Sequence, residues 1–271
     1  MELPDHPVLR RNHVQVRGQG PRTLLFAHGF GCDQQMWRFV EPVMADRCRT
    51  VLFDYVGCGQ ADNKAWNARR YSSLEGYADD IIEVLDALAL RDVVFVGHSV
   101  SSMIGALAAI RRPELFDSLV MVCPSPRYIN DPPDYHGGFE ARDIEGLLEL
   151  METNMIGWAD YLAPVIMDNP DRPELSQELA GSFCAGDPAI GRQFARLVFF
   201  SDNRADLPRV PVPSLVVQCA RDAIAPVSVG EHVRDHLPQA TLRLLDIAGH
   251  CPHMSHPAET VRCLEEWLAT R

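Results

Sequence analysis

Short apolar runs recur along the chain and predict the strands of a sheet. Runs with little polar alternation lie at residues 13–16, 23–27, 50–53, 93–96, 119–122, 215–217 and 242–245. Such runs are typical of strands covered on both faces, as in a parallel sheet. Helical patterns fall between them, and the clearest is an amphipathic helix from Tyr77 to Leu88, capped by Ser72 or Ser73 with Glu75 in its first turn. The alternation predicts an α/β fold.

This alternation is interrupted between residues 127 and 208. The interval shows no clear strand, and helical patterns occur at 144–151, 157–167, 173–183 and 188–200. It also carries many large apolar side chains, some of which must belong to the core. We interpret residues 127–208 as a helical cap inserted into a core formed by residues 1–126 and 209–271. The first dozen residues are expected to form a loose tail.

Composition and charge restrict the partners and the cellular compartment. The formal net charge is −12, which disfavours nucleic acid and anionic membranes as partners. The chain has no apolar stretch approaching 18 residues and no apolar signal core at its start, so we expect a cytoplasmic protein. The eight cysteines are scattered and form no CxxC pair, which favours reduced and mostly buried thiols.

A serine follows the apolar run at 93–96 directly, where a tight turn leads into the next helical pattern. The sequence Gly97-His98-Ser99-Val100-Ser101 matches four of the five positions of the nucleophile elbow G-x-S-x-G, with serine in place of the last glycine. A serine on such a turn is either a turn residue or a nucleophile. The run before it and the helix after it favour Ser99 as the nucleophile.

A nucleophilic serine needs a base, a group that orients the base, and donors for the oxyanion. Asp222 and His250 each follow an apolar run, and they come in the expected order of serine, acid and histidine. Asp246 is the alternative acid, but it is too near His250 in sequence to be the usual partner. The backbone N–H groups of Val100 and Phe30 are the predicted oxyanion donors.

The segment from His250 to His256 offers a competing interpretation as a zinc site. It contains Cys251 and a further imidazole at His253. The histidines do not share a helix face, and two prolines interrupt the segment. We therefore predict no metal site, and we expect His253 and His256 to form hydrogen bonds around the loop that positions His250.

These motifs resemble the α/β-hydrolase superfamily, and within it the subfamily of the bacterial stress-response regulator RsbQ and the plant strigolactone and karrikin receptors. The matching segments are HGFGCDQ (28–34), LFDYVGCG (52–59), GHSVSSMIG (97–105), RRPELF (111–116), PSPRYINDPPDYHGGFE (124–140), FFSDNR (199–204) and GHCPHMSHP (249–257). The resemblance covers nearly the whole chain. It implies an eight-stranded sheet, a four-helix cap and the triad Ser99, Asp222 and His250. We expect no cofactor. The implied walls of an apolar pocket are Phe30, Tyr128, Phe139, Trp158 and Phe199.

Two functions follow from these expectations. One is a serine hydrolase of small apolar esters or lactones of the butenolide kind, with a role in stress signalling. The other is a signalling protein that supplies or senses a small apolar ligand for a PAS-domain phosphatase. A relative of dehalogenases is disfavoured because those enzymes need an aspartate where this chain has Ser99. Perhydrolysis as in haloperoxidases is compatible only as a side reaction.

Overall fold

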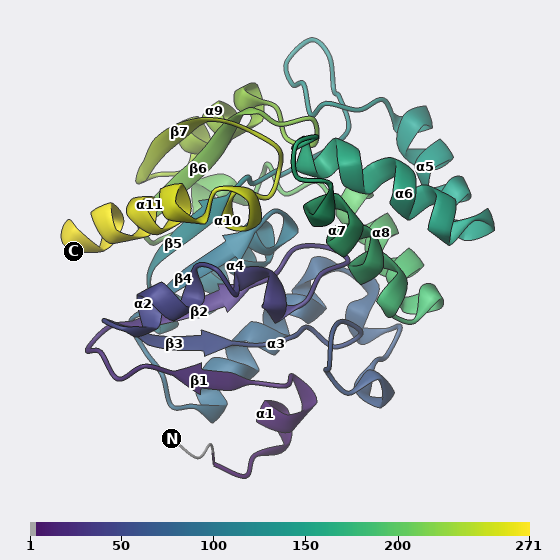
Figure 1. The fold of residues 1–271 in the computed structure, drawn as a ribbon. Helices are drawn as coiled ribbons and strands as arrows, with labels where there is room; N and C mark the ends of the chain where they lie inside the picture. Colours follow the sequence, from purple (N-terminus) through teal and green to yellow (C-terminus); the bar gives the residue numbers. More distant parts are fainter. Residues whose placement is uncertain (1–3) are drawn as a thin grey trace.

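The computed structural model describes residues 4–271 and shows a single sheet with helices on both faces (Figure 1). Its strands are β1 (Gln15–Arg17), β2 (Thr23–Ala27), β3 (Arg49–Leu52), β4 (Val93–His98), β5 (Phe116–Val122), β6 (Ser214–Arg221) and β7 (Ala240–Ala248). Its helices are α1 (Pro7–Arg11), α2 (Glu41–Ala45), α3 (Leu74–Ala87), α4 (Val100–Arg111), α5 (Ala141–Thr153), α6 (Met155–Met167), α7 (Pro173–Ala185), α8 (Pro188–Phe200), α9 (Val227–His236), α10 (Pro252–Ser255) and α11 (Pro257–Ala269). The short 3-10 helices are η1 (Gln34–Trp37), η2 (Asn63–Ala65), η3 (Arg70–Ser72), η4 (Pro113–Leu115) and η5 (Leu207–Arg209).

The strands hydrogen-bond in the order β1-β3-β2-β4-β5-β6-β7, and all pairs except β1 with β3 are parallel. At the centre, Val96 of β4 pairs with Phe26 of β2 and with Val120 of β5. Every residue of β4 is buried, because α2 and α11 lie on one face of the sheet and α3, α4 and α9 on the other (Figure 1). The predicted α/β-hydrolase fold class is confirmed.

Two details at the amino-terminal edge differ from the expectation. The resemblance implied eight strands, but within residues 4–271 the sheet has seven. The chain ahead of β1 is helical: Pro7 begins α1, and the His6 side chain accepts a hydrogen bond from the N–H of Val8. The prediction of a loose tail is wrong for residues 7–11, and residues 1–3 of that tail lie outside the described part.

The helices predicted within residues 127–208 are present as α5, α6, α7 and α8, all between β5 and β6. They gather together at one end of the sheet (Figure 1). Hydrogen bonds tie them to the loops beneath. The Ser182 hydroxyl of α7 donates to the carbonyl of Gly31 at 2.8 Å, and the N–H of His250 donates to the carbonyl of Ile166 in α6 at 2.7 Å. The division into a core and a cap at these boundaries stays a prediction.

Two expectations from composition bear on the same part of the chain. Within residues 4–271, each helix is too short or too polar to cross a bilayer. All eight cysteines are free thiols, and six of them are buried, as predicted. The Sγ atoms of Cys123 and Cys219 approach to 3.6 Å without a disulfide bond.

Candidate active site

Ser99 lies on the turn between β4 and α4, as the elbow motif predicts. Its backbone has φ 55° and ψ −121°, an unfavourable conformation for a residue with a side chain. The turn also requires a small residue before it, because a Cβ on Gly97 would lie 2.8 Å from the backbone of Ser101. The close packing of strand and helix therefore fixes the direction in which Ser99 points.

Ser101 replaces the glycine at the end of the elbow motif, and its hydroxyl has a structural use. It donates to the carbonyl of His28 at 2.5 Å, so the hydroxyl of Tyr55, 3.0 Å away, donates to it in turn. All three residues are buried. The departure from the motif thus ties the first turn of α4 to the loop after β2, which carries Phe30.

The structure brings the three predicted catalytic side chains together. His250 Nε2 lies 2.8 Å from Ser99 Oγ, and His250 Nδ1 lies 2.8 Å from Asp222 Oδ2. Asp222 follows β6 and His250 follows β7, so adjacent parallel strands deliver both to the carboxyl edge of the sheet. The chain therefore contains a hydrogen-bonded Ser-His-Asp arrangement.

Asp222 is held as a carboxylate by its surroundings. Burial by itself raises the pKa of Asp222, but His250 and the backbone N–H groups of Ile224 and Ala225 together hold that pKa below its usual value. The ionised carboxylate fixes the proton of His250 on Nδ1, which leaves Nε2 as an acceptor for the Ser99 hydroxyl. The alternative acid, Asp246, has a side chain that is 97% exposed, and it pairs with Arg221 instead.

His98 fixes the loop that carries His250. The Nε2–H of His98 donates to the carbonyl of His250 at 2.9 Å. A second proton could therefore bind this ring only at Nδ1. Burial, reinforced by the neighbouring His250, lowers the pKa of His98 to about 3, so His98 is neutral at physiological pH. Together with the bond to Ile166, this contact holds the backbone of His250 from two sides.

Tyr128 has a role that the sequence reasoning missed. Its hydroxyl lies 3.1 Å from Ser99 Oγ, and the residue is buried. Because Ser99 donates its own proton to His250, the Tyr128 hydroxyl donates to Ser99 Oγ. Burial raises the pKa of Tyr128, which keeps its proton in place. The resemblance named Tyr128 only as a wall residue, and no sequence spacing connects it with Ser99.

The predicted oxyanion donors lie on the two segments that flank Ser99. Val100 is the first residue of α4, where an N–H has no partner within its own helix. Phe30 lies in the loop after β2, and within residues 4–271 its N–H has no acceptor. Both N–H groups are thus available to a ligand, and their assignment as oxyanion donors stays a prediction.

A cavity of about 40 Å³ opens at Ser99 and His250. We call it the inner cavity, and its lining is Phe30, Cys32, His98, Ser99, Tyr128, Leu162, Ile166, Leu179, Phe183, Val198, Phe199, Ile224, His250 and Cys251. Phe30, Tyr128 and Phe199 line it as the resemblance implied. Leu162 and Ile166 were not predicted, although their spacing of four residues on one helix face is a signal that could have found them.

The other two expected wall residues lie elsewhere. Phe139 is half-buried and is absent from the lining of the inner cavity, because its backbone bridges to Ile129 and its N–H donates to the carbonyl of Tyr128. Trp158 is fully buried and lines a second cavity beside the first. The chain path at residues 129–139 and the rotation of α6 decide these placements.

The histidine segment shows a different arrangement from the expected one. His256 bonds to the hydroxyl of Ser255 at 2.9 Å, but His253 makes no hydrogen bond within residues 4–271. Its ring packs instead between Trp37 and His98, with centroids 4.5 Å from each. The prediction of a hydrogen-bonding His253 is therefore wrong, because the loop turns this ring into the apolar core.

His98, Cys251 and His253 place their potential ligand atoms within 4.8 Å of one another. Burial raises the pKa of the Cys251 thiol well above its usual value, which opposes the thiolate that a metal requires. His98 Nε2 is also engaged with the carbonyl of His250. The donor set fits a metal poorly, and the absence of metal and cofactor stays a prediction.

Comparisons with known proteins agree with this geometry. The family described as "Alpha/beta hydrolase family" matches residues 24–262. Strigolactone esterase RMS3 of Pisum sativum is 39% identical over 260 residues, which cover 96% of this chain and 97% of that protein. Karrikin insensitive 2 receptor CA of Petunia hybrida is 38% identical over 247 residues, 91% of each chain. The structure of olei00960, a hydrolase from Oleispira antarctica, matches with a TM-score of 0.96 at 42% identity and covers 100% of both chains. The chain is thus a hydrolase of the alpha/beta hydrolase family.

Proposed function

We propose that this hydrolase cleaves small apolar esters or lactones through an acyl-enzyme formed on Ser99. The observation that carries the proposal is the line of hydrogen bonds from Ser99 Oγ through His250 to Asp222, with both contacts at 2.8 Å. This is the geometry that an activated serine nucleophile requires. The apolar walls of the inner cavity favour an uncharged substrate.

Each step uses a group that is already in place. Ser99 Oγ attacks the carbonyl carbon while its proton passes to His250 Nε2, and the N–H groups of Phe30 and Val100 stabilise the oxyanion. The bond to the alcohol oxygen then breaks, and that oxygen takes the proton from His250. Water next attacks the acyl carbon, gives a proton to His250, and displaces Ser99 Oγ, which recovers the proton.

Tyr128 assists the second half of this cycle. Its O–H points to Ser99 Oγ, and in deacylation that oxygen is the leaving group. A hydrogen bond to an oxygen that gains negative charge stabilises the transition state more than the ground state. The side chain therefore favours release of the acyl group over its accumulation.

The test is hydrolysis of p-nitrophenyl acetate by the wild type and by Ser99→Ala, with intact mass spectrometry on the same samples. Turnover is expected to vanish in the variant, and a transient gain of ~42 Da, one acetyl group, that persists when Cys184 is replaced is expected only where Ser99 is present. Because Cys184 is an exposed thiol that activated esters can acylate, Cys184→Ser is the matched control and should retain turnover. Full activity in a folded Ser99→Ala protein would end the assignment. A butenolide series then defines the lactone range.

A second candidate is ligand sensing, because matching relatives are named Karrikin insensitive 2 receptor CA and IA. In this proposal the ligand occupies the inner cavity and the helices α5–α8 dock a partner protein. The PAS-domain phosphatase, the role in stress signalling and the RsbQ-like identity rest on the sequence resemblance alone. Native mass spectrometry of the chain with a purified PAS-domain phosphatase, with and without a butenolide, tests this role. A complex that forms only with ligand supports it, and no complex in either sample contradicts it.

A further inference from the structure

A second cavity lies directly beside the inner one. We call it the outer cavity, and its volume is about 170 Å³. The two cavities share Phe30, Cys32 and Phe183 in their linings. Ser99 and His250 line only the inner cavity, whereas the surface loops at residues 57–60 and 185–187 line only the outer one. A molecule that enters between these loops meets the outer cavity before it reaches Ser99.

The sizes of the cavities limit what each can hold. A space for one water corresponds to roughly 10–15 Å³ on this measure. The inner cavity of about 40 Å³ therefore takes about three non-hydrogen atoms, the size of an acetyl group. The outer cavity of about 170 Å³ takes roughly a dozen, the size of a substituted ring. Any ester larger than a few atoms has to place its remaining part outside the inner cavity.

Phe30 lies at the boundary between the two spaces. Its ring centroid is 5.9 Å from that of Phe199 in the inner cavity, and 5.6 Å and 6.3 Å from those of Phe194 and Trp158 in the outer cavity. Such edge contacts between aromatic rings are individually weak, so the ring can adjust at modest cost. The backbone of the same residue carries the predicted oxyanion donor, so the boundary lies beside the reacting carbonyl.

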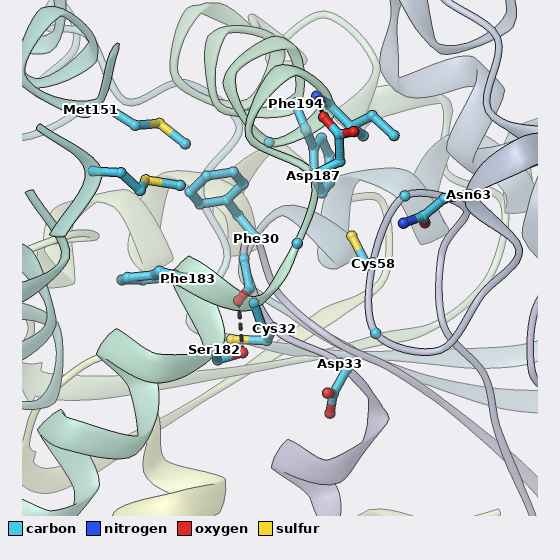
Figure 2. A pocket seen from close by; sticks show the side chains of 18 of the residues that line it. Phe30, Cys32, Asp33, Cys58, Asn63, Met151, Ser182, Phe183, Asp187 and Phe194 are labelled. Carbon is cyan, nitrogen blue, oxygen red and sulfur yellow. Dashed lines mark hydrogen bonds between the residues drawn. The ribbon is translucent and has the colours of Figure 1, made fainter. Parts of the chain in front are cut away.

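The walls of the outer cavity are apolar on one side and polar on the other. Figure 2 shows Met151, Phe183 and Phe30 gathered on one side, with Asp33 and Asn63 across from them. Lysine and arginine are absent from the described lining, which contains two carboxylates, Asp33 and Asp187. An anionic group is therefore disfavoured, and a hydroxyl or ammonium donor near the carboxylates is favoured.

One buried donor in this cavity has no partner. Trp158 lines the outer cavity, is fully buried, and its indole N–H has no acceptor within residues 4–271. An unsatisfied buried donor destabilises the folded chain, and a ligand oxygen in reach of this N–H satisfies it. One residue of the lining therefore carries an unsatisfied donor, and the polar residues of the cavity supply acceptors.

We propose that the outer cavity is a second substrate subsite, which binds the half of the ester that the inner cavity cannot hold. Its ligand is an uncharged or cationic group of about one ring, with an acceptor oxygen for Trp158 and a donor for the carboxylates. The proposal rests on the proposed function, because it assigns the reacting carbonyl to Ser99. It assigns the choice of substrate to a site that does not touch the triad.

Gly191 provides a way to fill this cavity without disturbing the triad. It lines the outer cavity on α8, and a Cβ built there would meet only Met151 Cε, at 3.6 Å. Gly191→Leu therefore projects a side chain into the space, and leucine is a better helix former than glycine. The matched control is Gly146→Leu on α5, where a Cβ has no neighbour within 4 Å and no described cavity is lined.

The experiment compares acetate esters that share the acyl group and differ in the alcohol. They are ethyl acetate, 4-(hydroxymethyl)phenyl acetate and 4-carboxyphenyl acetate, each corrected for its rate of hydrolysis by hydroxide. In the wild type we expect kcat/KM to be at least tenfold higher for the hydroxymethyl ester than for the carboxylate. Gly191→Leu is expected to lower the ratio of hydroxymethyl ester to ethyl acetate at least tenfold, and Gly146→Leu to leave it unchanged. An unchanged ratio in Gly191→Leu would overturn the subsite.

Binding separates this proposal from the proposed function. Calorimetry with Ser99→Ala measures the Kd of the intact hydroxymethyl ester without turnover. The double variant Ser99→Ala/Gly191→Leu is expected to bind it at least tenfold more weakly, and Trp158→Phe in the same background several-fold more weakly. If the wild type hydrolyses no ester, the proposed function fails while these Kd values still decide whether the subsite exists. Equal Kd values in all these variants would overturn the subsite even if the esters are hydrolysed.

Discussion

The inner and outer cavities hold their polar groups in opposite ways. Around the inner cavity, Ser99, His250 and Asp222 are buried and each bonds to the next. Around the outer cavity, the Trp158 N–H lacks an acceptor among residues 4–271, and Asn63 is exposed. The ends of parallel strands fix the chemistry, whereas helices and loops form the space that selects a ligand. Substitutions in the triad should therefore lower kcat, whereas substitutions around the outer cavity should change the ratio of kcat/KM between different esters.

The largest expected effect comes from the hydrogen-bonded triad beside the inner cavity. Asp222→Asn should lower kcat by about 10³–10⁴-fold, because an amide no longer holds the His250 proton on Nδ1. The control is Asp246→Asn, which changes an exposed carboxylate in the same part of the chain and should leave kcat unaltered. Steady-state hydrolysis of p-nitrophenyl acetate measures both. An equal loss of kcat in the two variants would show that Asp222 is not the acid of the triad.

Tyr128→Phe tests whether an inner-cavity wall residue also takes part in the chemistry. Loss of the hydroxyl removes the bond to Ser99 Oγ and should slow deacylation by roughly tenfold, with a smaller effect on acylation. Rapid-quench mass spectrometry should then find more acyl-enzyme than in the wild type. Phe199→Leu is a control for the loss of wall contacts. If Tyr128→Phe slows both steps equally, the hydroxyl has no separate role in deacylation.

Ser101→Ala probes the link between the elbow and the Phe30 loop. The change leaves the buried Tyr55 hydroxyl and the His28 carbonyl without this partner, which should cost about 1–3 kcal/mol of unfolding free energy. We also expect kcat to fall several-fold, because the loop then holds Phe30 less firmly. Urea denaturation and ester hydrolysis measure the two effects. The control is Ser118→Ala, which changes a buried serine on β5 and should lower the unfolding free energy without changing kcat. An unchanged kcat in Ser101→Ala would contradict the proposed link.

The pH dependence of stability concerns the buried histidines behind the triad. Burial lowers the pKa of His98 to about 3 and that of His253 well below its usual value. Below about pH 6.5 these histidines take up protons in the unfolded chain but not in the folded chain. Their contribution to the unfolding free energy is therefore fully present above that pH and is lost as the pH falls towards 3. At pH 5 the loss from His98 is about 2 kcal/mol.

Denaturation by urea at pH 8 and pH 5 measures this slope. In His253→Phe the difference between the two pH values should shrink, because phenylalanine takes up no proton when the chain unfolds. The exposed His136 supplies the control His136→Gln, which should keep the full difference. An undiminished difference in His253→Phe would show that this histidine is protonated in the folded protein.

Local sequence patterns predicted the helices and strands and the order of the catalytic residues along the chain. The apolar runs placed the seven strands, the helical spacing placed α5 to α8, and the order of Ser99, Asp222 and His250 placed the triad at the strand ends. Such features are local, since each depends on periodicity and on turn residues within a few positions of one another. Because the strands pair in parallel, the three side chains that follow them then lie at the same edge of the sheet, at the carboxyl ends of the strands.

The contacts between side chains in and around the helical insertion could not be predicted from local patterns and follow from the tertiary packing. Tyr128 contacts Ser99 although 29 residues separate them, and Trp158 lines the outer cavity. His253 turns into the apolar core and has no hydrogen-bond partner in the described part of the chain. Phe139 falls outside the inner cavity although the resemblance placed it there. These outcomes depend on how helices rotate and how side chains of similar apolar character fill space, because non-directional packing leaves no periodic signal in the sequence.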